Sequence, residues 1–205
     1  MKRTYGFSLI ELIVVITIIG FLMAIGVPAF MTWLRNVQIR NGAEAIMNGM
    51  QTARMEALRR NERVTFWLVS LTDPRVMDNS CARSTTGSSW VVSRDDPASL
   101  CATVASDTTA PRIIQTKAAG DGNINVSITA VDASGTGTSC ITFNGFGRPE
   151  AKCSDLAASE PIVGVDVVSS QADSNTRNFS IRVSAGGDIR MCDPAVKNAA
   201  DPRVC

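Results

Sequence analysis

A long apolar run dominates the first third of the chain. From residue 7 to residue 34 the only charged side chain is Glu11, and the 23 residues from 12 to 34 are interrupted only by Thr, Gly and Pro. An α-helix of about 20 apolar residues crosses the roughly 30 Å hydrocarbon core of a bilayer. The run therefore predicts a transmembrane helix, with one carboxylate near its beginning.

The charges that flank this run predict its orientation. Lys2 and Arg3 precede it and the next basic residue is Arg35, which favours a cytoplasmic N-terminus. A secretory signal has a shorter apolar core and ends in a small-residue cleavage site, and no such site follows closely here. We therefore expect a retained single-pass segment, with the rest of the chain outside the inner membrane.

The helical pattern continues beyond the apolar run as an amphipathic stripe. Apolar or small residues recur in steps of three and four, which is the period of one helix face; they are Ile39, Ala43, Ile46, Met50, Ala53 and Ala57. One helix from Phe7 to about Arg60 would be about 80 Å long. Within it, Gly20, Gly26 and Pro28 predict a kink or a local break, because proline removes one backbone hydrogen bond and crowds the preceding turn.

After residue 63 the pattern changes to short β-type runs separated by turn-forming residues. The predicted strands are Val64–Leu71, Trp90–Ser93, Arg112–Thr116, Asn123–Ala130, Cys140–Asn144, Ile162–Ser169 and Phe179–Ser184. A long helix followed by many short strands predicts an α+β fold, in which an antiparallel β-sheet head covers the amphipathic half of the helix. The expected divisions are 1–6, 7–34 and 35–205, the last combining an amphipathic helix at 35–60 with a β-rich domain at 64–205.

The cysteines indicate an oxidising compartment. All six follow residue 80 and none forms a C-x-x-C pair; they are Cys81, Cys101, Cys140, Cys153, Cys192 and Cys205. An even number confined to one region favours disulfides over a zinc site. Sequence alone does not fix the connectivity, but sequential pairing is favoured because each bond would close a short loop, worth about 3 kcal/mol in the chain-entropy description.

The remaining composition argues against catalysis and against a dedicated nucleic-acid-binding domain. The chain has no histidine, and its 20 basic and 19 acidic residues leave a formal charge of +1. Triads that depend on histidine are therefore excluded, and strong overall basicity is lacking. No nucleophile motif, paired-carboxylate pattern, phosphate-binding loop or metal-ligand spacing stands out. We expect no enzyme activity, no cofactor and no metal.

The N-terminal sequence "MKRTYGFSLIELIVVITIIGFLMAIGVPAF" resembles a type IV prepilin. The matching features are a short basic leader, Gly6 followed by Phe7, Glu11 as the fifth residue after that junction, and Pro28. Downstream, "ITFNGFGRP" (141–149) and "SAGGDIRMCDP" (184–194) resemble the FimT/FimU minor pilins and the related GspH pseudopilins. The cysteine-rich stretch from about 73 to 110 has no counterpart in that resemblance.

The resemblance implies a processing site and a docking residue. Prepilin peptidase would cut between Gly6 and Phe7, so that 1–6 is the leader, and the new Phe7 amine would be N-methylated. A carboxylate deep in a bilayer costs at least about 2.5–3.5 kcal/mol on insertion scales. In a filament core, Glu11 would instead pair with the Phe7 amine of a neighbouring subunit, an attraction that low dielectric strengthens. The disulfide Cys192–Cys205 would close a C-terminal loop like that of many pilins.

The leading functional prediction is a non-catalytic minor pilin that primes assembly of the pilus or forms its tip. Its partners would be other minor pilins, the major pilin, prepilin peptidase and the inner-membrane assembly platform. The chain would sit in the bacterial inner membrane with a periplasmic head before it enters the filament. A pseudopilin of a type II secretion system is the alternative, and the residues do not separate the two.

A third interpretation is a DNA-binding pilin for natural transformation. Some FimT-like pilins bind DNA through a Gly-Arg-x-Arg motif, and the corresponding stretch here is Gly187-Asp188-Ile189-Arg190. An aspartate in place of the first arginine repels phosphate. Arg190 is therefore a weak candidate for a DNA contact.

Overall fold

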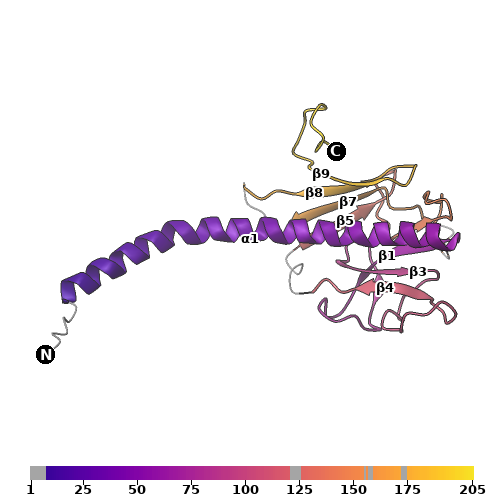
Figure 1. The fold of residues 1–205 in the computed structure, drawn as a ribbon, viewed down its shortest axis with the longest axis horizontal. Helices are drawn as coiled ribbons and strands as arrows, with labels where there is room; N and C mark the ends of the chain where they lie inside the picture. Colours follow the sequence, from indigo (N-terminus) through magenta and orange to yellow (C-terminus); the bar gives the residue numbers. More distant parts are fainter. Residues whose placement is uncertain (1–7, 121–125, 155, 157–158, 172–174) are drawn as a thin grey trace.

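One helix runs through the molecule and carries a β-rich head on its C-terminal half (Figure 1). The computed structural model describes residues 8–120, 126–154, 156, 159–171 and 175–205. Helix α1 spans Leu9–Arg60, begins at the N-cap Ser8 and ends at Asn61, which adopts a left-handed conformation (φ 52°). The Glu62 N–H then donates to the Ala57 carbonyl oxygen, the wrapped hydrogen bond typical of helix C-termini.

Of the kink or local break predicted at Gly20, Gly26 and Pro28, the break is wrong. Helix α1 is continuous through all three positions, and Figure 1 shows only a gentle curve in the N-terminal half. A proline removes a single N–H from the ladder, and the unbroken helical turns on either side carry the chain across that gap. The two glycines have no neighbouring atoms that would force a bend.

The first sheet is antiparallel and centres on β1. It contains β1 (Val64–Ser70), β2 (Ala82–Arg83), β3 (Ser89–Ser93), β4 (Ile113–Lys117) and β6 (Cys140–Phe143). Strand β1 pairs with β3 along one edge, and with β6 and then β2 along the other. Strand β4 extends the sheet beyond β3.

The second sheet is also antiparallel, in the order β5-β7-β8-β9. Its strands are β5 (Val126–Val131), β7 (Gly164–Ser169), β8 (Phe179–Val183) and β9 (Ile189–Cys192). Sequence predicted seven of the nine strands in the described residues close to their observed bounds. For the run predicted at 123–130, residues 123–125 lie outside the described residues. The two strands that were missed are β2, which has only two residues, and β9.

The main core lies between α1 and the inner faces of both sheets. The stripe from Ile39 to Ala57 is buried on the helix side, and residues such as Phe66, Trp90 and Ile181 meet it from the strands. The antiparallel head and the buried stripe confirm the predicted α+β fold. Because the stripe begins at Ile39, the head covers only the C-terminal part of α1.

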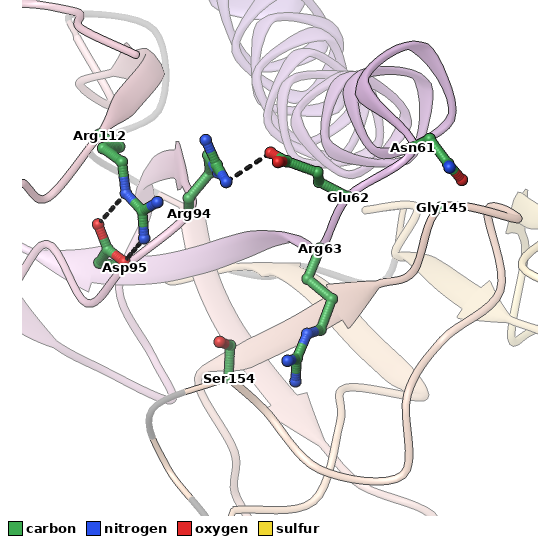
Figure 2. Close-up of a pocket in the computed structure, with 8 residues that line it drawn as sticks. All are labelled: Asn61, Glu62, Arg63, Arg94, Asp95, Arg112, Gly145 and Ser154. Atoms are coloured by element: carbon green, nitrogen blue, oxygen red, sulfur yellow. Dashed lines mark hydrogen bonds and ion pairs between the residues drawn. The ribbon is translucent and has the colours of Figure 1, made fainter. Parts of the chain in front are cut away.

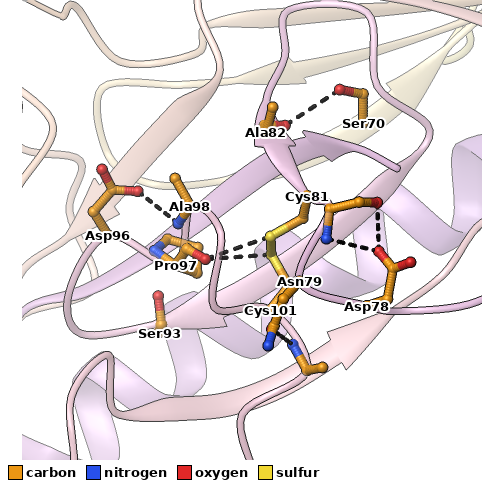
Figure 3. Close-up of a disulfide and its surroundings, with 12 residues drawn as sticks. Ser70, Asp78, Asn79, Cys81, Ala82, Ser93, Asp96, Pro97, Ala98 and Cys101 are labelled. Atoms are coloured by element: carbon orange, nitrogen blue, oxygen red, sulfur yellow. Dashed lines mark hydrogen bonds between the residues drawn. A yellow bond between two sulfur atoms is a disulfide. The ribbon is translucent and has the colours of Figure 1, made fainter. Parts of the chain in front are cut away.

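A second apolar cluster lies on the opposite face of the first sheet. It includes Trp67, Val69 and Val91 together with four cysteines of two disulfides. The segment between β1 and β4 covers this face and is closed by Cys81–Cys101 (Figure 3). Asn79 Oδ1 accepts from the Ala102 N–H at 3.0 Å and ties the two ends of the loop together. The loops of the stretch from 73 to 110, on either side of β3, thus shield a sheet face that would otherwise be exposed.

The remaining cysteines form Cys140–Cys153 and Cys192–Cys205, with a sequence separation of 13 in each case. All three bonds join neighbours along the chain, as the loop-closure argument favoured. Cys140–Cys153 fastens the segment after β6 to the second cluster, and Cys192–Cys205 returns the C-terminus to the end of β9.

Candidate functional site

The N-terminal half of α1 is an apolar rod that the head leaves uncovered. Every residue from Ser8 to Met31 is exposed, including Leu9 at 76% and Phe21 at 68%. By length and composition this helix can cross a membrane. An apolar surface of this extent is unfavourable in water, so it requires lipid or other protein around it.

Glu11 lies in the first turn of that rod. The Ser8 hydroxyl accepts from the Glu11 N–H at 3.2 Å, which fixes the helix start one turn before the carboxylate. A negative charge in this position is favoured by the partial positive charge of the helix N-terminus. No ion pair joins Glu11 to another of the described residues, so a buried Glu11 would need a cation from outside this part of the chain. Gly6 and Phe7, the predicted processing residues, lie outside the described residues.

The two motifs singled out downstream meet at the distal end of α1. An alanine Cβ at Gly187 would lie 2.1 Å from the Gly147 carbonyl oxygen, so the two loops touch through their backbones. Arg54 Nε donates to that same oxygen at 3.1 Å. Gly147 (φ 71°) and Gly187 (φ 84°) both adopt left-handed conformations that favour glycine. These residues therefore position the loops on the helix.

The distal end of the head also contains an open pocket of about 490 Å³. Figure 2 shows its lining, which is rich in arginines and carboxylates. Arg94 pairs with Glu62 at 2.5 Å, and Arg112 binds both carboxylate oxygens of Asp95. The Arg112 guanidinium lowers the pKa of the Asp95 carboxyl, which keeps this pair ionised. The arrangement is a set of compensated ion pairs that joins the helix end to β3 and β4.

This pocket offers no recognisable catalytic chemistry. Its lining residues, as labelled in Figure 2, provide no general base next to a nucleophile. Within the described ranges, no group of three or more His, Cys, Asp or Glu could hold a metal ion.

Arg190, the candidate DNA contact, is exposed on β9. Its Nη2 donates to the Cys205 carbonyl at 3.4 Å, so the side chain is directed at the C-terminal loop. The Nη2 atom of its cross-strand neighbour Arg182 lies 3.2 Å from Oδ1 of Asp166. In that loop, Arg203 lowers the pKa of Asp201 to about 2. Carboxylates thus accompany two of the nearby cations, and the structure does not gather an uncompensated basic patch around Arg190.

Comparison with known proteins matches two parts of the chain, one to a protein family and one to a sequence motif. A family model described as "Type II transport protein GspH" matches residues 42–187, and the model of the prokaryotic N-terminal methylation motif matches residues 1–27. No match was found among curated proteins.

Two solved structures resemble the chain weakly. Both are of the type IV minor pilin FimU from Pseudomonas aeruginosa, in two crystal forms, at 12% identity and a TM-score of 0.41. The match covers 78% of this chain and 99% or 95% of the other.

Proposed function

The chain belongs to the GspH family of type II transport proteins, and on that premise we propose that it is a non-catalytic filament subunit, a minor pilin of the FimT/FimU type. It helps to prime assembly of a pilus or forms its tip. Its partners are other minor pilins and the major pilin, with prepilin peptidase and the inner-membrane platform acting on it before assembly. It resides in the inner membrane with a periplasmic head until it is extracted.

The observation that carries this proposal is the uncovered apolar half of α1 with one carboxylate in its first turn. This rod is long enough to cross a bilayer, and the residues of α1 that the head buries begin at Ile39. The same surface can therefore lie in lipid first and then among the helices of other subunits. A helix buried within its own domain could not make that exchange.

Among the helices of other subunits, Glu11 selects how neighbouring subunits align. Cleavage after Gly6 creates a new positively charged amine on Phe7, four positions before the carboxylate. In a bundle of such helices, the Glu11 carboxylate of one subunit pairs with the Phe7 amine of the next, while wrong registers leave a buried charge unpaired. The pair thus favours one axial position of neighbouring subunits.

The test is to replace Glu11 and to measure the protein in sheared filaments and in membranes. Glu11→Ala should remain membrane-inserted and processed but be depleted from filaments by about tenfold or more, because an unpaired buried amine costs several kcal/mol. Glu44→Ala is the matched control, since it removes a carboxylate from the same helix that pairs with Arg40 one turn away. Equal amounts of the Glu11→Ala and unchanged proteins in filaments would refute the docking role.

A pseudopilin of a type II secretion system is the second candidate, and the description of the matching family favours it. Its subunits would use the same rod and the same Glu11, so the helix does not separate the two functions. Purification of the filament that contains the chain distinguishes the two functions. Co-purification with a major pilin supports the pilus, whereas loss of protein secretion on deletion supports the pseudopilus.

A further inference from the structure

A groove of about 1130 Å³ opens where α1 emerges from the head. One wall is the helix from Ala29 to Arg40, and the other consists of the segments 175–179 and 193–203. Trp33 lies in this wall at 59% exposure, and its ring centroid is 5.7 Å from that of Phe30. The groove therefore lies at the boundary between the uncovered rod and the covered helix.

Asn36 fastens the two walls together. Its Nδ2 donates to the Asn175 carbonyl at 3.3 Å, and its Oδ1 accepts from the Arg177 N–H at 2.8 Å. These two bonds hold the backbone of Arg177 against the helix, about one turn beyond Trp33. The position of Arg177 along the axis of α1 is thus set by the side chain of Asn36, which belongs to α1 itself.

The length of the apolar run places this groove at the membrane surface. The 23 residues from 12 to 34 span about 34 Å as a helix, against a hydrocarbon core of about 30 Å. Trp33 then lies in the interfacial layer, where tryptophan is enriched, and Arg177 lies just outside it, in the layer of the lipid phosphates. The placement of the groove at the membrane surface rests on membrane insertion, which is part of the proposed function.

One cation of the groove, Arg177, is left to meet an anionic headgroup. Its lining contains three arginines and one aspartate, namely Arg40, Arg177, Arg203 and Asp193. Arg40 is engaged by Glu44 and Arg203 by Asp201. No hydrogen bond or ion pair joins the Arg177 guanidinium to any of the described residues.

Apolar groups complete the lining beside these charges. Val37 on the helix and Phe179, Pro194 and Ala195 on the opposite wall contribute carbon surface to the groove. A ligand with an anionic head and an apolar body matches this division.

We propose that this groove binds the headgroup of an anionic phospholipid of the outer leaflet of the inner membrane, with the phosphate on Arg177 and the glycerol and upper acyl carbons against Trp33 and Phe179. The bound lipid fixes the height and the tilt of the head above the bilayer before extraction. It is released when the rod enters a filament, since the lipid leaves with the bilayer.

Native mass spectrometry of the full-length protein in detergent tests this proposal, with phosphatidylglycerol and phosphatidylcholine titrated separately. An arginine near an anionic lipid surface contributes about a fivefold gain in affinity. We therefore expect phosphatidylglycerol to be retained at least fivefold more strongly than phosphatidylcholine. Arg177→Gln should remove about that factor. Arg148→Gln is the matched control, because Arg148 is also exposed but lies in the distal loop next to Gly147.

Three results would overturn the proposal: equal retention of both lipids, unchanged retention by Arg177→Gln, or an equal loss in Arg148→Gln. The last would indicate a general charge effect. Asn36→Ala adds an independent check, because it releases the loop while it keeps every charge, and it should also weaken retention. Alkaline washing of membranes separates this inference from the proposed function. Release of the protein by alkali would refute both, whereas a membrane-retained protein without lipid selectivity would refute the groove alone.

Discussion

Gly49 lies on the buried face of α1, where the helix crosses the first sheet. Glycine in a helix interior is normally less stable than alanine by about 1 kcal/mol, so Gly49→Ala would stabilise an isolated helix. In this fold the new Cβ would lie 2.7 Å from Phe66 Cε2 and 2.8 Å from Trp90 Cδ2 and Cε2. Both rings are buried, at 0% and 2% exposure, and have little room to move away.

The magnitude follows from these opposing effects. Overpacking of a filled core costs about 1–3 kcal/mol, and contact with two immobile rings favours the upper part of that range. After subtraction of the helix gain, we expect Gly49→Ala to lower the free energy of unfolding by about 1–2 kcal/mol. For a protein of this size that corresponds to a fall in melting temperature of about 2–8 °C.

Thermal unfolding of the full-length protein in detergent, followed by tryptophan fluorescence, measures this change. Gly26→Ala is the control, because it alters the same helix where no atom lies within 4 Å of the new Cβ, and it should not lower the melting temperature. A Gly49→Ala protein as stable as the unchanged one would show that α1 does not pack on Phe66 and Trp90 at this distance.

Three further changes probe the head. Replacing Cys81 and Cys101 together by serine should lower the free energy of unfolding by about 3 kcal/mol, measured by urea denaturation, and an unchanged midpoint would contradict a covering role for their loop. Gly187→Ala should lower the free energy of unfolding by at least about 1–2 kcal/mol, because a left-handed alanine is strained and its Cβ would strike a backbone oxygen. Urea denaturation measures this change as well. Arg112 lowers the pKa of Asp95 below its usual 3.8, so this pair stabilises the fold fully above about pH 5 and less as the pH falls through and below 3.8. Asp95→Asn should therefore lower the urea midpoint near pH 7 and lose that effect near pH 2, and a pH-independent difference would refute the ion pair.

The family resemblance drawn from the N-terminal motif and the two downstream segments is confirmed by the family match. The motif was readable because its residues lie close together in the chain. The roles of Gly6, Phe7 and Glu11 stay predictions, since two of these residues lie outside the described part and the role proposed for the third involves another subunit.

The downstream glycines illustrate a different limit. Gly147 and Gly187 were noticed as parts of motifs, but their shared role requires two loops 40 residues apart to meet beside Arg54. Similarly, the sequence singled out Arg190 by a motif, whereas only the structure shows that its cross-strand neighbour Arg182 pairs with Asp166. Spacing along the chain does not report such pairings, because strands bring distant residues together.

The sequence by itself determined the apolar rod, the amphipathic stripe and the alternation of the longer strands, because each depends on a period. It favoured the sequential disulfides, because each closes a short loop, but did not fix them. Only the tertiary structure decided that α1 continues through Pro28, that the 73–110 stretch shields the outer face of the first sheet, and that Asn36 holds Arg177 at the mouth of the groove. Those features depend on contacts between segments far apart in the chain, or on how one lost hydrogen bond is balanced by its surroundings. Local pattern carries no information about either.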